Sequence, residues 1–182
     1  LAGPYEDIEV ILEPGPESDA WEGIQGVASF YVHQAKGKWF GFFGSAWVDH
    51  KENTWWSGLA EAPAMAGPWK RCSELNPLTQ ISEVFVENPI VSKLPDNSYI
   101  ALFDRGFAGK FGYSTSKDGV DWSHEVEIDL EPHVNKWWTF MRTPLGLIDQ
   151  GNGIYDVYYT ALKGEFPDAC GWVGKVTFKL KS

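Results

Sequence analysis

Glu87 is the residue of this sequence best suited to acid chemistry. It stands in the stretch Phe85–Val91, which reads as a short buried strand with one carboxylate at its entry. A carboxylate among apolar residues is costly unless it is paired or lines a solvated cavity. Glu87 is therefore either an acid or polar group of a binding site, or the structural partner of a cation such as Arg142 or Arg105.

Gln25 and Arg142 occupy what we interpret as the same step in two similar stretches. After each of the three polar residues, a second apolar run led by an aromatic residue follows at a similar interval, beginning at Trp39, Tyr99 and Tyr155. Three equivalent strands that carry different polar residues at matched positions predict that these side chains face one common site. A guanidinium can bind ligand groups bidentately or hold a neighbouring acid in place, so Arg142 is a site candidate, with a structural ion pair as the alternative.

Aromatic residues are the compositional outlier, since they make up 15% of the chain and include 10 Trp. Trp and Tyr offer flat apolar faces with a polar edge, and such faces match the C–H patches of sugar rings. Trp138, in the pair Trp137-Trp138, is our candidate platform, and Trp55-Trp56 is a similar pair. Core packing is the alternative for both pairs, because alternation along a strand sends neighbouring rings to opposite faces.

Arg105, the histidines and the cysteines give weaker indications of function. Arg105 ends a predicted strand, where it either borders the cavity or forms an exposed turn pair with Asp104. The four histidines have no metal-ligand spacing, so we expect no metal site. His133 lies near the start of a predicted repeat unit, but it has no partner ligands at a suitable spacing. Cys72 and Cys170 are too far apart for a zinc knuckle and too few for a disulfide scaffold. We expect two free, buried thiols, with a disulfide as the alternative.

Charge and hydropathy exclude two classes of partner. The formal charge is −10 with a pI near 4.8, and no basic stripe exists, which argues against nucleic acid. No run of 18 apolar residues is present, so we expect no membrane span. No signal peptide is visible, but one could have been removed. The compartment is open, with secretion or the periplasm favoured slightly over the cytoplasm.

The elements that must position these residues are strands. Short runs rich in β-branched and aromatic residues alternate with turn chemistry, and no capped helical pattern occurs. The interval from Gln25 to Glu87 is similar to that from Glu87 to Arg142, and each contains four short strand-like runs. An internal repeat of this kind predicts the four-stranded blade of an all-β propeller.

The repeat predicts a single, partial propeller domain over residues 1–182. Residues 1–22 would be the end of a preceding blade and a linker, with Gly3-Pro4-Tyr5 as its closing turn. The blades themselves would span residues 23–81, 82–135 and 136–182. A closed ring needs at least four blades. We therefore expect either a fragment that lacks an N-terminal part, or a chain whose ring is completed by a second copy or another chain.

Three motifs carry a resemblance to a known group. Glu87-Asn88-Pro89 opens an inner strand, Ser116–Trp122 forms a turn with the sequence Ser-Lys-Asp-Gly-Val-Asp-Trp, and Ala60–Pro63 leads into Gly67-Pro68-Trp69. This combination resembles the five-bladed β-propeller glycoside hydrolases, the group that includes family 43 arabinanases and β-xylosidases and the invertase-like enzymes. The resemblance covers about three blades, and its motifs are short.

The resemblance implies glycosidic-bond hydrolysis of a poly- or oligosaccharide, with Glu87 as general acid and no cofactor beyond a structural Ca²⁺. It also implies two Asp residues on earlier blades, where this sequence has Gln25 instead. Cleavage requires a second carboxylate about 5 to 9.5 Å away. The alternatives are therefore a non-catalytic carbohydrate-binding propeller, or an inactive fragment that lacks the partner carboxylates.

Overall fold

The computed structural model contains only strands and turns in the part of the chain that it describes. The described residues are 4, 7–48, 53–81, 86–105, 110–128, 130, 137–165 and 168–179. Gly3, Tyr5, Phe85 and His133, named above, lie outside these ranges. The described strands form three antiparallel sheets, which confirms the predicted all-β class.

The first two sheets are four-stranded meanders. Blade A contains β1 (Ala28–Ala35), β2 (Lys38–Val48), β3 (Asn53–Ala62) and β4 (Lys70–Arg71) in that spatial order. Blade B contains β5 (Glu87–Lys93), β6 (Tyr99–Asp104), β7 (Phe111–Ser116) and β8 (Val126–Ile128).

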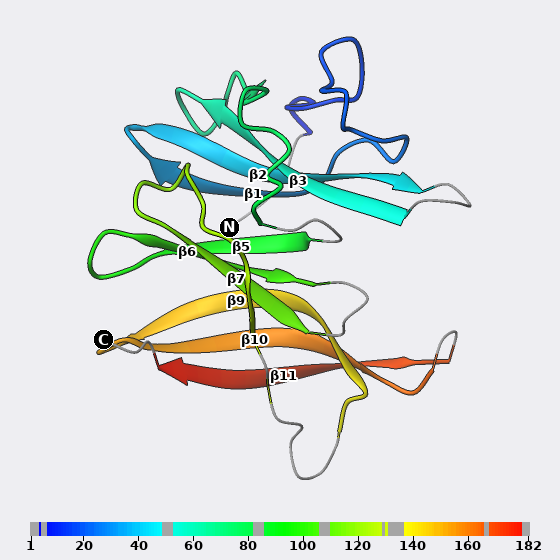
Figure 1. Cartoon of the computed structure of the whole chain (residues 1–182), viewed down its shortest axis with the longest axis vertical. Coiled ribbons are helices and arrows are strands. Elements are labelled where there is room, and N and C mark those ends of the chain that lie inside the picture. The colour runs from blue at the N-terminus through cyan, green and yellow to red at the C-terminus, as the bar shows by residue number, and fades with distance from the viewer. Residues whose placement is uncertain are drawn as a thin grey trace.

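Blade C has three strands in the described part of the chain, not the four expected of a full unit. They are β9 (Phe140–Gly151), β10 (Ile154–Lys163) and β11 (Cys170–Lys179), with β10 in the middle. Figure 1 shows the three sheets stacked in chain order, with blade B between blades A and C. The first strand of each blade contacts the first strand of the next, since β1 packs on β5 and β5 on β9.

Tight turns and apolar strands explain this architecture. The β1–β2 and β9–β10 hairpins close through Lys36-Gly37 and Asn152-Gly153, all four with positive φ, as two-residue hairpin turns require. The middle strand β6 is buried along most of its length. A strand covered by neighbouring sheets on both faces reads as a continuous apolar run, which is the pattern of Tyr99–Asp104.

Two buried clusters hold the blades together. Between blades A and B, the core includes Phe42, Leu59, Phe103 and Trp122. Between blades B and C, it includes a second set of buried residues: Ile90, Leu102, Phe111, Met141, Val157 and Tyr159. Successive side chains of β6 point to opposite faces, so Phe103 belongs to the first core and Leu102 to the second.

The Ser116–Trp122 turn contributes to the packing between blades A and B. The Asp118 carboxylate accepts hydrogen bonds from the backbone N–H groups of Val120 and Asp121, both at 2.9 Å. It also pairs with Lys36 of blade A at 2.7 Å. Burial alone would raise the pKa of Asp118, but these interactions together hold it far below its usual range. The turn places the ring of Trp122 against Phe42, with ring centroids 5.2 Å apart.

Both cysteines are free, and they differ in exposure. Cys72 is half-buried, and burial raises the pKa of its thiol to about 11. Cys170 is exposed, contrary to the expectation of two buried thiols, because it begins the edge strand β11. Within the described ranges, no helix is long and apolar enough to cross a membrane.

Candidate functional site

The site residues lie at irregular positions in β1, β5 and β9, the first strands of the three blades, which we call the inner strands. In β1 the pairing register shifts between Ala28 and Tyr31, and in β5 it shifts between Glu87 and Ile90. Ser29 and Asn88 lie inside these two shifts with φ values of 57° and 52°. Such β-bulges bend a strand and re-aim its side chains. The two strands therefore bend at equivalent positions, directly after Ala28 in β1 and directly after Glu87 in β5.

This register corrects the position assigned to Gln25. The residue that corresponds to Glu87 in blade A is Ala28, which pairs with Gly44 as Glu87 pairs with Asp104. Gln25 precedes β1 and is exposed, and its backbone N–H donates to the carbonyl of Ala46 at 3.4 Å. Counting back from the first aromatic residue of the second strand (Trp39 or Tyr99) does not find equivalent positions in the two blades. The reason is that the turn between β1 and β2 is shorter than the loop between β5 and β6.

Glu87 and Arg142 do meet. The Nη2 of Arg142, on β9, lies 3.2 Å from Oε2 of Glu87, on β5. The Glu87 side chain is 16% exposed and the Arg142 side chain 36% exposed. Arg142 lies within the register shift of β9 between Met141 and Pro144, so its position differs by one step from that of Glu87. An ion pair that joins two blades forms at this point, with both side chains still in contact with solvent.

Asp104 is the third member of this cluster. It is the last residue of β6 and stands directly opposite Glu87 in the register of the two strands. Its side chain is fully buried, and Oδ2 lies 2.6 Å from Nη1 of Arg142. One guanidinium therefore bridges two carboxylates, one fully buried and one partly exposed. We name Glu87, Asp104 and Arg142 the inner-strand cluster.

Asp104 is a member of the cluster that the sequence did not reveal, because its place before Arg105 suggested half of an exposed turn pair. A signal was present, since Asp104 ends a run of otherwise buried residues on β6. Its partner could not be identified, because an uninterrupted β5–β6 register from Lys93–Tyr99 would place Asp104 opposite Asn88. Only the bulge between Glu87 and Ile90 brings the two carboxylates face to face.

Arg105 does not reach the inner-strand cluster. Its guanidinium forms two hydrogen bonds with the carboxylate of Glu125, at 2.7 and 3.0 Å, and an ion pair with Glu127 on β8. Alternation along the strand sends Asp104 and Arg105 to opposite faces. Arg105 therefore neither borders the site nor pairs with Asp104. It forms ion pairs at the outer edge of blade B, where Glu127 lies on β8.

Trp138 is half-buried in the packing of blade C. Its ring meets that of Trp137 edge to face, with centroids 6.5 Å apart, and Trp137 in turn packs on Tyr159 at 5.8 Å. Burial raises the pKa of the Tyr159 hydroxyl, and a hydrogen bond with Trp138 partly offsets that increase. Both Trp rings contribute to the core between blades B and C.

A polar strip crosses the three inner strands beside the cluster. The Ser29 hydroxyl donates to Oδ1 of Asn88 at 3.0 Å, and Nδ2 of Asn88 donates to the Thr143 hydroxyl at 3.4 Å. These three residues join blades A, B and C through side chains alone. Among the described residues, no group of three or more His, Cys, Asp or Glu side chains could hold a metal ion.

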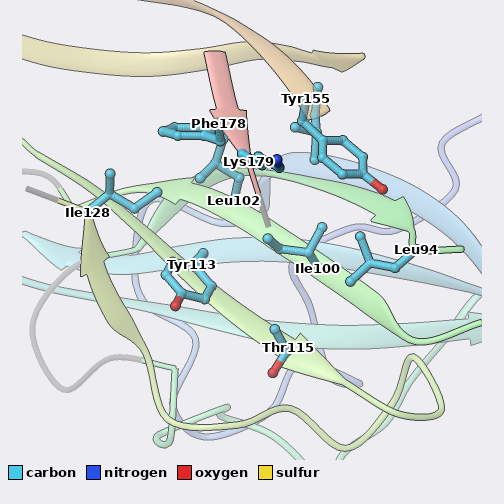
Figure 2. A pocket seen from close by; sticks show the side chains of 10 residues that line it. Leu94, Ile100, Leu102, Tyr113, Thr115, Ile128, Tyr155, Phe178 and Lys179 are labelled. Atoms are coloured by element: carbon cyan, nitrogen blue, oxygen red, sulfur yellow. The ribbon is translucent and has the colours of Figure 1, made fainter. Parts of the chain in front are cut away.

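A cavity of about 500 Å³ lies between blades B and C, apart from the cluster. Figure 2 shows its lining, which includes Leu102 and Ile100 of β6, Tyr113 of β7 and Phe178 of β11. The members of the inner-strand cluster are not among the lining residues. The lining is mainly apolar, and Tyr113, Thr115, Tyr155 and Lys179 are its polar residues, whereas the inner-strand cluster combines two carboxylates with a guanidinium. The inner-strand cluster is the better candidate site.

Chemically, the cluster combines a proton carrier with a hydrogen-bonding cation. Glu87 is the carboxylate of the cluster that is partly exposed, so it is the one that a ligand could reach. Asp104 is fully buried and bonded to Arg142, so it is not placed to attack a ligand. The cluster suits proton donation and the binding of hydroxyl groups.

Comparison with known proteins identifies the fold. No protein-family model and no curated protein matches the chain. Among solved structures, a thermostable family-43 glycoside hydrolase matches with a TM-score of 0.59 and 14% identity over 85% of this chain and 51% of its own. A putative glycoside hydrolase from Bacteroides ovatus matches with a TM-score of 0.59 and 17% identity, over 89% of this chain and 56% of its own.

A third solved structure is a family-43 enzyme from Xanthomonas citri in complex with xylotriose. It has a TM-score of 0.60 and 15% identity, over 86% of this chain and 53% of its own. This chain thus spans about half the length of the structures that it matches. The described blades have the fold of the β-propeller glycoside hydrolases of family 43, as a partial propeller.

Proposed function

We propose that this chain is part of a glycoside hydrolase-like propeller that acts on a poly- or oligosaccharide, with Glu87 as general acid. The observation that carries the proposal is the position of Glu87. It opens the inner strand of blade B, is partly exposed and shares Arg142 with a buried second carboxylate. A general acid must lie within reach of its substrate, and Glu87 is the carboxylate of this pair that is open to solvent.

Arg142 has a double role in this proposal. Its guanidinium fixes the Glu87 side chain and leaves part of its own surface open to solvent, where N–H donors can bind sugar hydroxyls. The carboxylate that activates water would come from a blade outside the described residues, or from a second chain that completes the ring. Native mass spectrometry of the purified protein would detect such a second chain.

A general acid can be tested by varying the leaving group. An aryl glycoside with a highly acidic phenol leaves without protonation, whereas an alkyl glycoside or xylo-oligosaccharide needs a proton from the enzyme. Glu87→Gln should therefore lower kcat/KM on unactivated glycosides by about 10² to 10⁴, and change it much less on 2,4-dinitrophenyl glycosides. Equal activity of parent and variant on both substrate types would rule out Glu87 as the acid.

A non-catalytic carbohydrate-binding propeller is the second candidate. It is favoured by Ala28, which stands in blade A where Glu87 stands in blade B, so that blade supplies no carboxylate at the matching step. Calorimetric titration with xylotriose separates the two functions. Binding by both parent and Glu87→Gln, with no turnover of any glycoside by the parent, would support the binding module over the hydrolase.

A further inference from the structure

The cavity between blades B and C has walls from both blades. Blade B supplies Ile100 and Leu102 from β6, and blade C supplies Tyr155 from β10 and Phe178 from β11. Its volume of about 500 Å³ lies within the usual range of small-molecule sites, about 300 to 1,000 Å³. The cavity is therefore large enough for an organic molecule of moderate size.

Tyr155 places an unsatisfied hydroxyl group at this cavity. The residue lines the wall and is 2% exposed, and its hydroxyl oxygen has no hydrogen-bond partner among the described residues. In Figure 2 its ring extends from β10 towards Ile100 and Leu94 on the opposite wall, with the hydroxyl at the far end. Buried polar groups are almost always hydrogen-bonded. An oxygen atom of a bound molecule would supply the acceptor that this hydroxyl needs.

The surroundings of Tyr155 favour a neutral acceptor. Burial raises the pKa of the Tyr155 hydroxyl, and the charges of Asp149 and Asp96 raise it further, so the hydroxyl keeps its proton and acts as a donor at neutral pH. Two carboxylates that act on this pKa would also repel an anion placed beside the hydroxyl. An ether, carbonyl or hydroxyl oxygen therefore fits this position better than a carboxylate.

Lys179 gives the same cavity a positive charge at another point of its lining. It is exposed, and it forms no ion pair with any residue of the described ranges. The described lining residues include no Asp or Glu, although the whole chain has a formal charge of −10. An anionic group beside Lys179 would thus meet a cation without a carboxylate in the adjoining wall.

The rest of the lining suits a flat apolar body. The rings of Tyr113, Tyr155 and Phe178 line the cavity together with aliphatic side chains such as Leu147. Aromatic rings pack favourably on one another edge to face or with an offset. We propose that this cavity binds a small aromatic carboxylate that also carries a neutral oxygen, with Tyr155 donating to that oxygen and Lys179 pairing with the carboxylate. The site is separate from the inner-strand cluster and does not rest on the proposed hydrolase function.

Three related naphthalene compounds separate the two polar contacts. The first, 6-methoxy-2-naphthoate, has both the ether oxygen and the carboxylate; 2-naphthoate lacks the ether oxygen, and 6-methoxy-2-naphthamide lacks the charge. Equilibrium dialysis against the whole chain gives the Kd of each compound. We expect the compound with both groups to bind most tightly. No detectable binding of that compound at millimolar concentration would overturn the proposal.

Each variant should weaken only the compounds that carry the matching group. Tyr155→Phe should raise the Kd of the two methoxy compounds about fivefold and leave 2-naphthoate unchanged. Lys179→Met should raise the Kd of the two carboxylates about threefold at low salt and leave the amide unchanged. Tyr158→Phe and Lys163→Met are the matched controls on β10. Both residues are exposed and neither lines the cavity, so these variants should keep the Kd values of the parent.

A bulky side chain inside the cavity tests the location of the site. Ile100→Trp should fill the space between the blades and abolish binding of all three compounds. If Ile100→Trp does not fold, Thr115→Trp on β7 fills the same cavity from another wall. Binding by either folded variant with the Kd of the parent would overturn the proposed site. Parent affinities for every compound in both Tyr155→Phe and Lys179→Met would overturn the proposed ligand class.

Discussion

The side chains of Ser29 and Asn88 are hydrogen-bonded at 3.0 Å although the residues lie 59 positions apart in the chain. Both residues have positive φ, and both lie within the register shift of an inner strand. The left-handed region is uncommon for residues other than glycine, although Asn is enriched there. The repeated unit is therefore defined by a bulge in the inner strand as well as by the order of its strands.

Asn88 offers a test of the strain stored at this bulge. Asn88→Gly and Asn88→Ala both remove the amide, but only Ala has a Cβ that disfavours a φ of 52°. We expect Asn88→Ala to have a free energy of unfolding about 1 kcal/mol lower than that of Asn88→Gly. Urea denaturation of the two variants measures the difference. Equal stability would mean that the backbone relaxes away from the left-handed region.

Gly41 and Gly44 of β2 provide a matched pair for the packing of aromatic rings. A Cβ on Gly41 would overlap the Phe30 ring, whereas a Cβ on Gly44 would meet its nearest atom at 3.8 Å. Gly41→Ala should lower the free energy of unfolding by about 1 to 3 kcal/mol through overpacking. Gly44→Ala should be neutral or slightly stabilising. Thermal or urea unfolding that places both variants at the same stability would contradict this packing.

The ion pair between Arg71 and Glu22 attaches the segment before β1 to the outer strand of blade A. The Arg71 guanidinium contacts the two Glu22 oxygens at 2.5 and 2.9 Å, and the side chains are 7% and 2% exposed. Glu22→Gln leaves the guanidinium buried with a neutral partner. We expect a loss of about 3 kcal/mol in the free energy of unfolding.

An exposed ion pair in the same blade serves as the control. Lys38 and Glu61 also meet at 2.9 Å, but their side chains are 50% and 38% exposed. Glu61→Gln should change the free energy of unfolding by less than about 1 kcal/mol. Similar losses in Glu61→Gln and Glu22→Gln, measured by urea denaturation, would show that burial does not set the strength of the Arg71 pair.

His33 should make stability depend on pH. Its Nε2–H donates to the Gly119 carbonyl at 2.7 Å, and its Nδ1 is buried with no partner among the described residues. Burial lowers the pKa of His33 below 6.5, and the hydrogen bond to Gly119 offsets only part of this. Because the unfolded chain then binds more protons, His33 stabilises the fold fully above about pH 6.5. That stabilisation is lost progressively as the pH falls towards the folded pKa.

The measurement is urea unfolding at several pH values between 8 and 5. The slope contributed by one proton is at most about 1.4 kcal/mol per pH unit. His33→Gln should lack this contribution and lose less stability on acidification than the parent. His124→Gln is the control, since His124 is exposed, and it should retain the slope of the parent. A parent slope that persists in His33→Gln would assign the effect to other groups.

The sequence alone determined the fold class and indicated which residues could form the main contact of the site. Turn residues such as Lys36-Gly37 and the apolar runs of β2 and β6 are local signals, so they indicate hairpins without knowledge of the partner strand. The repeat of these signals predicted the propeller blades, and the fold confirms this prediction. The pairing of Glu87 with Arg142 was one of the alternatives that the sequence left open, and the ion pair shows that it forms, although Arg142 stands one step away from the position assigned to it.

The tertiary structure decided which residues surround Glu87. The bulges at Ser29 and Asn88 shift the register of β1 and β5, and no local pattern reveals them. They exclude Gln25 from the matching step and bring Asp104 opposite Glu87. Arg105 has the same charge as Arg142 but points to the other face of its strand, towards Glu125. Register and face are fixed only when whole sheets pack, which is why the second carboxylate could not be assigned from the sequence.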